Sequence, residues 1–188
     1  WSAPGSGIGS SSGSVYVSAF TLAANGDVVG GGNFTTAGGL PSIYLARLAS
    51  TCPAAVVVAG AGCPSSGGSN TLAATSLPWI GSTFRSRGTG LPMLAFVASV
   101  FGFSTTALPL ASVLPAGQPG CDLLVSPDGV DFQAIATGTA EYQAVVPNIP
   151  AIAGLVVHHQ MIPFEVDPQL NFVAITATNT LRLTLGIF

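Results

Sequence analysis

The sequence predicts an all-β protein, an antiparallel β-sandwich or jelly-roll-like module preceded by a short β-hairpin repeat unit. Short runs of β-branched and aromatic residues alternate with Gly, Pro, Ser and Asn along the whole chain, a pattern typical of many short strands joined by turns. No segment keeps the apolar period of 3.6 residues that marks an amphipathic helix. The length of 188 residues suits one medium domain with an appendage.

The composition is apolar and nearly uncharged. Only 6% of the residues are charged, with four arginines, no lysine and a net charge of -3, whereas about 25% is usual. Nucleic-acid binding needs clustered cations, and no apolar run approaches the ~18 residues of a membrane helix. We therefore expect no nucleic acid and no membrane span. Such a surface is expected to be buried against other copies of the chain or kept soluble by glycans.

The first 50 residues predict an arm followed by a β-hairpin. Residues 1–14 are rich in Gly and Ser, which is typical of a flexible arm or an irregular loop. Alternation over residues 15–22 predicts a strand. Asn25-Gly26 predicts the hairpin turn, because both residues tolerate a positive φ, and the return strand starts at Val28-Val29. A third strand is expected over residues 43–48.

The rest of the chain, residues 51–188, predicts a separate β-sandwich module. The last of its strands is expected to bend, or to pair as a hairpin, around Thr178-Asn179. Strands are expected near residues 54–59, 82–87, 93–101, 108–113, 121–126, 131–137, 140–146, 154–164 and 171–187.

Two groups of motifs carry a resemblance to known families. The motifs of the first group, in residues 1–50, are Trp1-Ser2, Gly5-Ser6-Gly7, Asn25-Gly26-Asp27-Val28-Val29-Gly30-Gly31, Phe34-Thr35-Thr36-Ala37-Gly38-Gly39 and Leu45-Ala46-Arg47-Leu48. Those of the second group, in residues 51–188, are Gly62-Cys63, Ser65-Ser66-Gly67, Leu108-Pro109-Leu110, Pro119-Gly120-Cys121-Asp122-Leu123 and Asn179-Thr180-Leu181-Arg182-Leu183. With these motifs, residues 1–50 resemble one delta-60-like bacterial β-propeller-type repeat unit, and residues 51–188 resemble a C-terminal β module of large secreted planctomycete-like proteins.

The resemblance implies an extracellular or cell-surface location and a structural or binding role, because neither family brings a catalytic motif. A repeat unit cannot bury its own faces. The single unit over residues 1–50 is therefore expected to pack on the second module, on further repeats or on a neighbouring molecule.

Three cysteines allow several pairings. Cys52 and Cys63 flank an expected strand, whose length separates its ends, so a disulfide between them requires a chain reversal at Gly60 or Gly62. Cys63–Cys121 is the preferred pair, and Cys52 is the alternative partner. Three reduced thiols are the other reading.

No catalytic residue, cofactor or metal site is expected. His158 and His159 are adjacent on an expected strand and point to opposite faces, so they are interpreted as ordinary strand residues. Asp128 and Asp131 are weak calcium candidates, since Pro127-Asp128-Gly129 is better explained as a β-turn. Glu165 and Asp167 are interpreted as part of a solvent-exposed face.

The expected function is that of a non-enzymatic extracellular structural protein, which self-associates into a filament or surface layer through exposed strand edges and apolar faces. The alternative is a glycan- or surface-binding C-terminal module of a larger adhesin-like protein. The residues on which these hypotheses rest are Val15, Val17, Phe20, Arg85 and Arg87 for assembly, Asn33 for glycosylation, and Trp79, Phe132 and Tyr142 for stacking on glycan.

Overall fold

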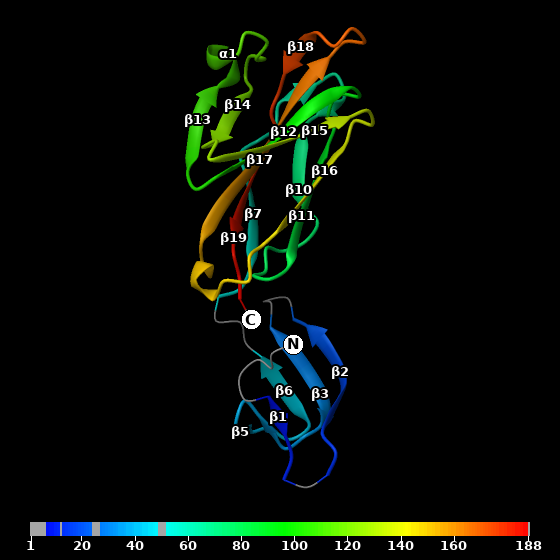
Figure 1. Ribbon diagram of the computed structural model, residues 1–188, viewed down its shortest axis with the longest axis vertical. Helices are drawn as coiled ribbons and strands as arrows, with labels where there is room; N and C mark the ends of the chain where they lie inside the picture. Colours follow the sequence, from blue (N-terminus) through cyan, green and yellow to red (C-terminus); the bar gives the residue numbers. More distant parts are fainter. Residues whose placement is uncertain (1–6, 12, 24–26, 49–51, 188) are drawn as a thin grey trace. The chain divides into compact units, whose positions relative to one another are not determined.

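The computed structural model describes residues 7–11, 13–23, 27–48 and 52–187, and nearly all of its regular structure is strand (Figure 1). The predicted all-β, sandwich-like fold class is confirmed. The chain divides into two compact units, residues 1–53 with 186–188, and residues 54–185. The expected boundary after residue 50 lies close to this division, whereas the return of the last residues to the first unit was not expected.

Unit 1 holds two small antiparallel sheets. One has the strand order β1-β4-β5 and the other has the order β2-β3-β6. The strands are β1 (Ile8–Gly9), β2 (Tyr16–Leu22), β3 (Val28–Asn33), β4 (Thr36–Ala37), β5 (Leu40–Pro41) and β6 (Leu45–Leu48).

The hairpin expected in unit 1 is present, because β2 pairs antiparallel with β3. Its turn residues Asn25 and Gly26 lie outside the described residues. Within residues 1–14, for which a flexible arm or an irregular loop is expected, Ile8 and Gly9 instead form β1 and pair with β4. Alternation is too short over two residues to reveal such a strand.

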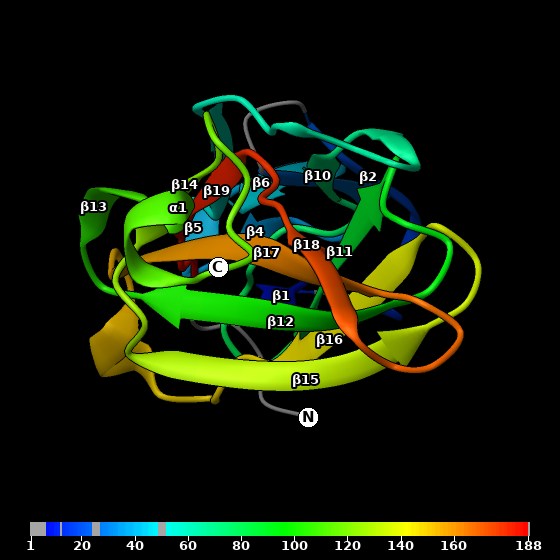
Figure 2. The same ribbon diagram turned by 90° about the horizontal axis from the view of Figure 1, so that it is seen from above.

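Unit 2 is built on a six-stranded sheet with the order β15-β12-β17-β19-β7, in which β18 also pairs with β17. Figure 2 shows β12 between β15 and β17. The strands are β7 (Ala55–Ala59), β12 (Ala95–Gly102), β15 (Gly129–Ile135), β17 (Val156–Val166), β18 (Phe172–Ile175) and β19 (Thr180–Thr184).

A three-stranded sheet, β10-β11-β16, forms the second layer of the sandwich. Its strands are β10 (Thr71–Ala74), β11 (Thr83–Thr89) and β16 (Ala140–Val145). Inward residues of this sheet, such as Leu72 and Phe84, join Val97, Met161 and Leu181 of the large sheet in one buried cluster. This cluster is the sandwich core.

The other face of the large sheet is covered too. A hairpin of β13 (Thr105–Pro109) and β14 (Asp122–Val125) and the short helix α1 (Leu110–Val113) pack a second cluster against it. Because both faces of β12 are covered, Ala98 and Val100 are buried as well as Val97. This explains why the sequence of β12 is an apolar run, interrupted by Ser99, rather than an alternating pattern.

The predicted strands of unit 2 need correction at residues 110–113 and in the segment 64–74. Residues 110–113, expected within a strand, form α1, because Leu110 is buried as an anchor and its N–H donates to the Cys121 carbonyl. Of the two alternatives expected for the segment 171–187, the structure has the bend and not the hairpin, since β18 and β19 both pair with β17 and not with each other. Strand β10 was missed, as was the small hairpin of β8 (Pro64–Ser65) and β9 (Gly68–Ser69).

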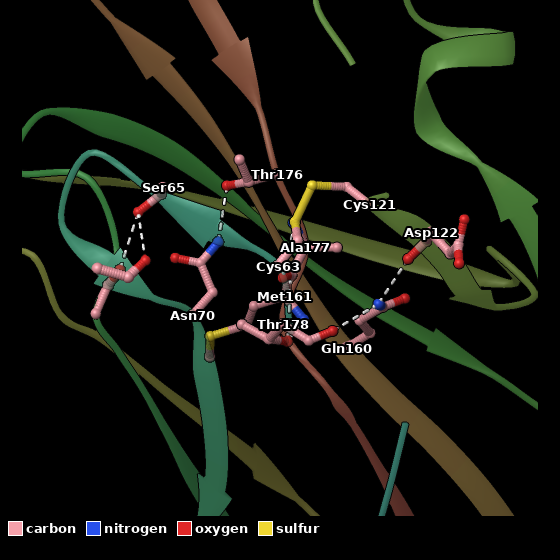
Figure 3. Close-up of a disulfide and its surroundings, with 12 residues drawn as sticks. Cys63, Ser65, Asn70, Cys121, Asp122, Gln160, Met161, Thr176, Ala177 and Thr178 are labelled. Carbon is pink, nitrogen blue, oxygen red and sulfur yellow. Dashed lines mark hydrogen bonds between the residues drawn. A yellow bond between two sulfur atoms is a disulfide. The ribbon is translucent and has the colours of Figure 1, made fainter. Parts of the chain in front are cut away.

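A disulfide joins Cys63 to Cys121, with Cα atoms 5.4 Å apart, as the preferred pairing predicted (Figure 3). Cys63 also exchanges backbone and sulfur contacts with Ala177, whose N–H lies 3.1 Å from Sγ. The disulfide therefore ties the segment after α1 to the bend between β18 and β19. Cys52 does not take part in this disulfide and pairs through its backbone with Ile187.

Candidate association surfaces

One face of unit 1 is an apolar groove. Pairing in register places Phe20, Gly30 and Ala46 side by side on this face, next to the row of Leu22, Val28 and Leu48. Gly30 has no side chain, so the floor of the groove is open between Phe20 and Ala46. The groove has a volume of about 490 Å³, and its lining residues are Ile8, Val17, Phe20, Val28, Gly30, Phe34, Ala46 and Leu48.

Unit 1 has almost no core of its own. Phe34 is the one hydrophobic side chain that is buried among the residues described in this unit, whereas Phe20 is 79% exposed. Asp27 is buried and forms an ion pair with Arg47 at 2.5 Å. Burial of apolar surface is the main favourable contribution to folding, and the described residues of this unit provide little of it.

Several strands lie at sheet edges. In unit 1, β2 is an outer strand and all seven of its residues are exposed, including Val17. Val15 lies just before β2 and is exposed as well. In unit 2, β7 and β15 are the two ends of the large sheet. An outer strand presents unpaired N–H and C=O groups that can pair with another chain.

A row of phenylalanines lies on the outer face of the large sheet. Phe132 and Phe172 are 64% and 60% exposed, and both contact Phe164, with ring centroids 6.4 Å and 5.9 Å apart. Phe96 pairs with Phe164 in register and shares this face. The rings are inclined to one another by 54° and 61°, so they form an apolar ridge rather than a flat platform.

The other two aromatic candidates do not join this row. Tyr142 packs against the sandwich core and contacts Phe101 and His159. Desolvation, with a smaller contribution from Asp131, raises the pKa of Tyr142. Trp79 lies in the segment between β10 and β11 and is half-buried. The structure therefore does not bring Trp79, Phe132 and Tyr142 together on one surface.

Arg85 and Arg87 share the outer face of β11, as expected from their spacing. Arg87 lies 3.9 Å from Glu141 of β16, and both side chains are largely exposed, so this ion pair contributes little to stability. The groove beside them is polar and is lined mainly by β11 and β16. Nothing else in this groove distinguishes it from a solvated surface.

The two histidines point to opposite faces, as predicted. His159 is fully buried, stacks on Phe101 at 4.1 Å, and has Nδ1 3.2 Å from the Val100 carbonyl and Nε2 3.0 Å from the Ser86 hydroxyl. A carbonyl only accepts hydrogen bonds, so Nδ1 carries the proton and Ser86 donates to Nε2. Burial lowers the pKa of His159 to about 4.

The sequence did not predict this contact between Ser86 and His159, because the two residues are far apart along the chain. Ser86 is 1% exposed and its hydroxyl points into the core. His159 Nδ1 contacts the backbone carbonyl of Val100 and not a carboxylate, so Ser86 and His159 lack the acidic residue of a catalytic triad. The arrangement is that of a satisfied buried polar contact.

The acidic candidates are held by local hydrogen bonds, Asp128 and Asp167 between strands and Asp131 within β15. Asp128 accepts hydrogen bonds from the Phe103 N–H and the Ser126 hydroxyl, and these lower its pKa. Asp167 accepts from the N–H and side-chain amide of Asn171, which lower its pKa. Asp131 accepts from the Phe132 N–H. Within the described ranges, no three His, Cys, Asp or Glu side chains gather as a metal site would require.

Asn33, the sequon residue, lies at the end of β3 and donates a hydrogen bond to the Ser14 carbonyl. Its glycosylation stays a prediction. Among the described residues, no helix is long and apolar enough to cross a membrane.

The fold and its surfaces define an all-β, disulfide-containing protein with two units and extensive exposed apolar surface. Comparison with protein-family models, curated proteins and solved structures finds no match. The resemblance to propeller-type repeats and to a secreted β module therefore stays a prediction.

Proposed function

We propose that this protein is a non-enzymatic extracellular structural protein that self-associates through the apolar groove of unit 1. The observation that carries the proposal is the combination of this groove with the near absence of a core in unit 1. A second copy supplies the same apolar face, and packing the two together would bury both Phe20 side chains. The disulfide supports the location, because disulfides persist in oxidising, extracellular compartments.

Substitution Phe20→Lys tests this proposal. A charge placed at the most exposed apolar side chain of the groove cannot be buried against another copy without a large desolvation cost. We expect the variant to form smaller assemblies than the wild type in analytical ultracentrifugation and electron microscopy. The matched control is Phe103→Lys, which makes the same change at a 65% exposed phenylalanine of unit 2.

The control variant should assemble like the wild type. A wild-type protein that stays monomeric over a concentration series would refute the proposal, as would a Phe20→Lys variant with unchanged assembly. Circular dichroism of both variants establishes that they are folded.

The phenylalanine row of Phe96, Phe132, Phe164 and Phe172 favours a second candidate, binding to extracellular glycan. Sugars stack on flat aromatic faces and also need hydrogen-bonding groups nearby, whereas these rings are mutually inclined. A glycan array probed with wild type and Phe132→Ala distinguishes the two functions. Binding that is lost in Phe132→Ala would favour the glycan-binding function.

A further inference from the structure

The outer edge of β7 lacks the features that usually prevent a strand from pairing with another chain. Its sequence, Ala55-Val56-Val57-Val58-Ala59, holds no polar side chain, and Val57 and Val58 are 50% and 61% exposed. No described strand pairs with β7 on the side away from β19. At the opposite end of the same sheet, β15 carries Asp131 and Gln133. Proteins commonly protect edges with charge, proline or bulges, and none of these lies within β7.

The sequence of β7 reads the same in both directions around Val57. If two copies align β7 antiparallel about a twofold axis at Val57, Val57 meets Val57, Val56 meets Val58, and Ala55 meets Ala59. Every position then faces a residue of matching size and polarity. Cross-strand pairs of β-branched residues stabilise such pairing, and a twofold contact of this kind uses the same residues from both partners.

The two faces of β7 suit this pairing. Val56 and Val58 pair with Leu183 and Leu181 and lie on the core side, beside an apolar groove that extends to Leu77. In a dimer, the Val56 and Val58 side chains of one copy would cover this groove of the other copy. Val57 pairs with Arg182 and lies on the outer face.

We propose that β7 is a second self-association site, at which two copies join their large sheets through antiparallel β7 strands centred on Val57. This inference rests on the proposed self-association and adds an interface in unit 2. One twofold contact alone closes a dimer, whereas two different contacts per molecule allow an open filament or layer. The β7 site therefore supplies the second contact that an extended assembly needs in addition to the unit 1 contact.

Variants at Val57 test the proposal in the full chain, in a Phe20→Lys background that removes the unit 1 contact. We expect Phe20→Lys to form dimers. Adding Val57→Lys opposes two lysines across the twofold axis and should weaken dimerisation by at least ~100-fold, because opposed like charges are strongly unfavourable. The matched control, Val130→Lys on β15, makes the same change at the other edge and should leave the dimer intact.

Opposite charges at residue 57 of the two copies give a sharper test of the proposed pairing. Val57→Lys and Val57→Glu, each in the Phe20→Lys background, should be monomeric alone and should form a mixed dimer when combined. The thermal midpoint of each variant checks folding, since residue 57 lies beside Arg182. Persistent dimers of the Val57→Lys variant, or no mixed dimer, would overturn the β7 proposal.

The outcomes separate the two proposals. If Phe20→Lys assembles like the wild type, the unit 1 contact is wrong, and Val57→Lys in the wild-type chain then tests β7 by itself. If Phe20→Lys is monomeric, the unit 1 contact stands and the β7 site is wrong.

Discussion

At the scale of single residues, buried polar side chains organise unit 2. Asn179 accepts a hydrogen bond from the Leu72 N–H and donates to the Leu72 carbonyl, so it joins β10 to the bend before β19. Gln160 contacts the backbone of Asp122, Leu124 and Thr178. His159 belongs to the same class, as a neutral imidazole with both nitrogens engaged. Such contacts are favourable only when every group has a partner.

His159 makes the stability of the protein depend on pH. The unfolded chain takes up a proton near the usual histidine pKa of 6.5, whereas folded His159 stays neutral down to about pH 4. Stability is therefore full above pH 6.5 and falls as the pH drops towards 4, by about 3 kcal/mol in total. Urea unfolding across this range measures it.

The variant His159→Gln should flatten this dependence, because glutamine does not titrate. His158→Gln should keep most of it, since His158 is only partly buried; desolvation, with a contribution from Arg182, lowers the pKa of His158. Equal slopes in the two variants would contradict the assignment to His159.

At the scale of elements, the disulfide holds the layer that covers the second face of the large sheet. Cys63 and Cys121 are separated by 58 residues, and the segment before Cys121 hydrogen-bonds to Ile175 at the outer edge of β18. The edge of β18 is thus covered by the chain itself, unlike the edge of β7. A cross-link of this span restricts the unfolded chain strongly.

Reduction of the disulfide should lower the free energy of unfolding by about 4 kcal/mol, the chain-entropy value for a loop of this length. The double variant Cys63→Ser, Cys121→Ser should show the same loss in urea unfolding. Hydrogen exchange should quicken first in α1 and the β13–β14 hairpin. A Cys52→Ser variant retains the disulfide and should remain sensitive to reduction, and a variant without that sensitivity would argue against the Cys63–Cys121 bond.

At the scale of the whole molecule, assembly is expected to depend on apolar surface rather than charge. Only 6% of the residues are charged, and neither the unit 1 groove nor β7 contains a charged side chain. Added salt screens charges, with a Debye length of about 10 Å at 0.1 M and about 3 Å at 1 M.

The assemblies should therefore persist, with unchanged or larger size, when the salt concentration rises from about 0.1 M to about 1 M. Sedimentation velocity at both concentrations measures this. Dissociation in high salt would instead point to ionic contacts, and Arg85 and Arg87 would be the first residues to substitute.

The sequence by itself determined the all-β class and most of the strand positions, because alternation and turn residues are local signals. It favoured Cys63–Cys121 but left other pairings open, and the structure decided between them because the two cysteines are 58 residues apart. The sequence also determined that His158 and His159 face opposite ways. Only the tertiary structure decided that both faces of β12 are covered, that Ser86 meets His159, that β18 and β19 share β17 as a partner, and that β7 is left at an edge. These features depend on which distant segments pack together, and no local pattern in the chain specifies that.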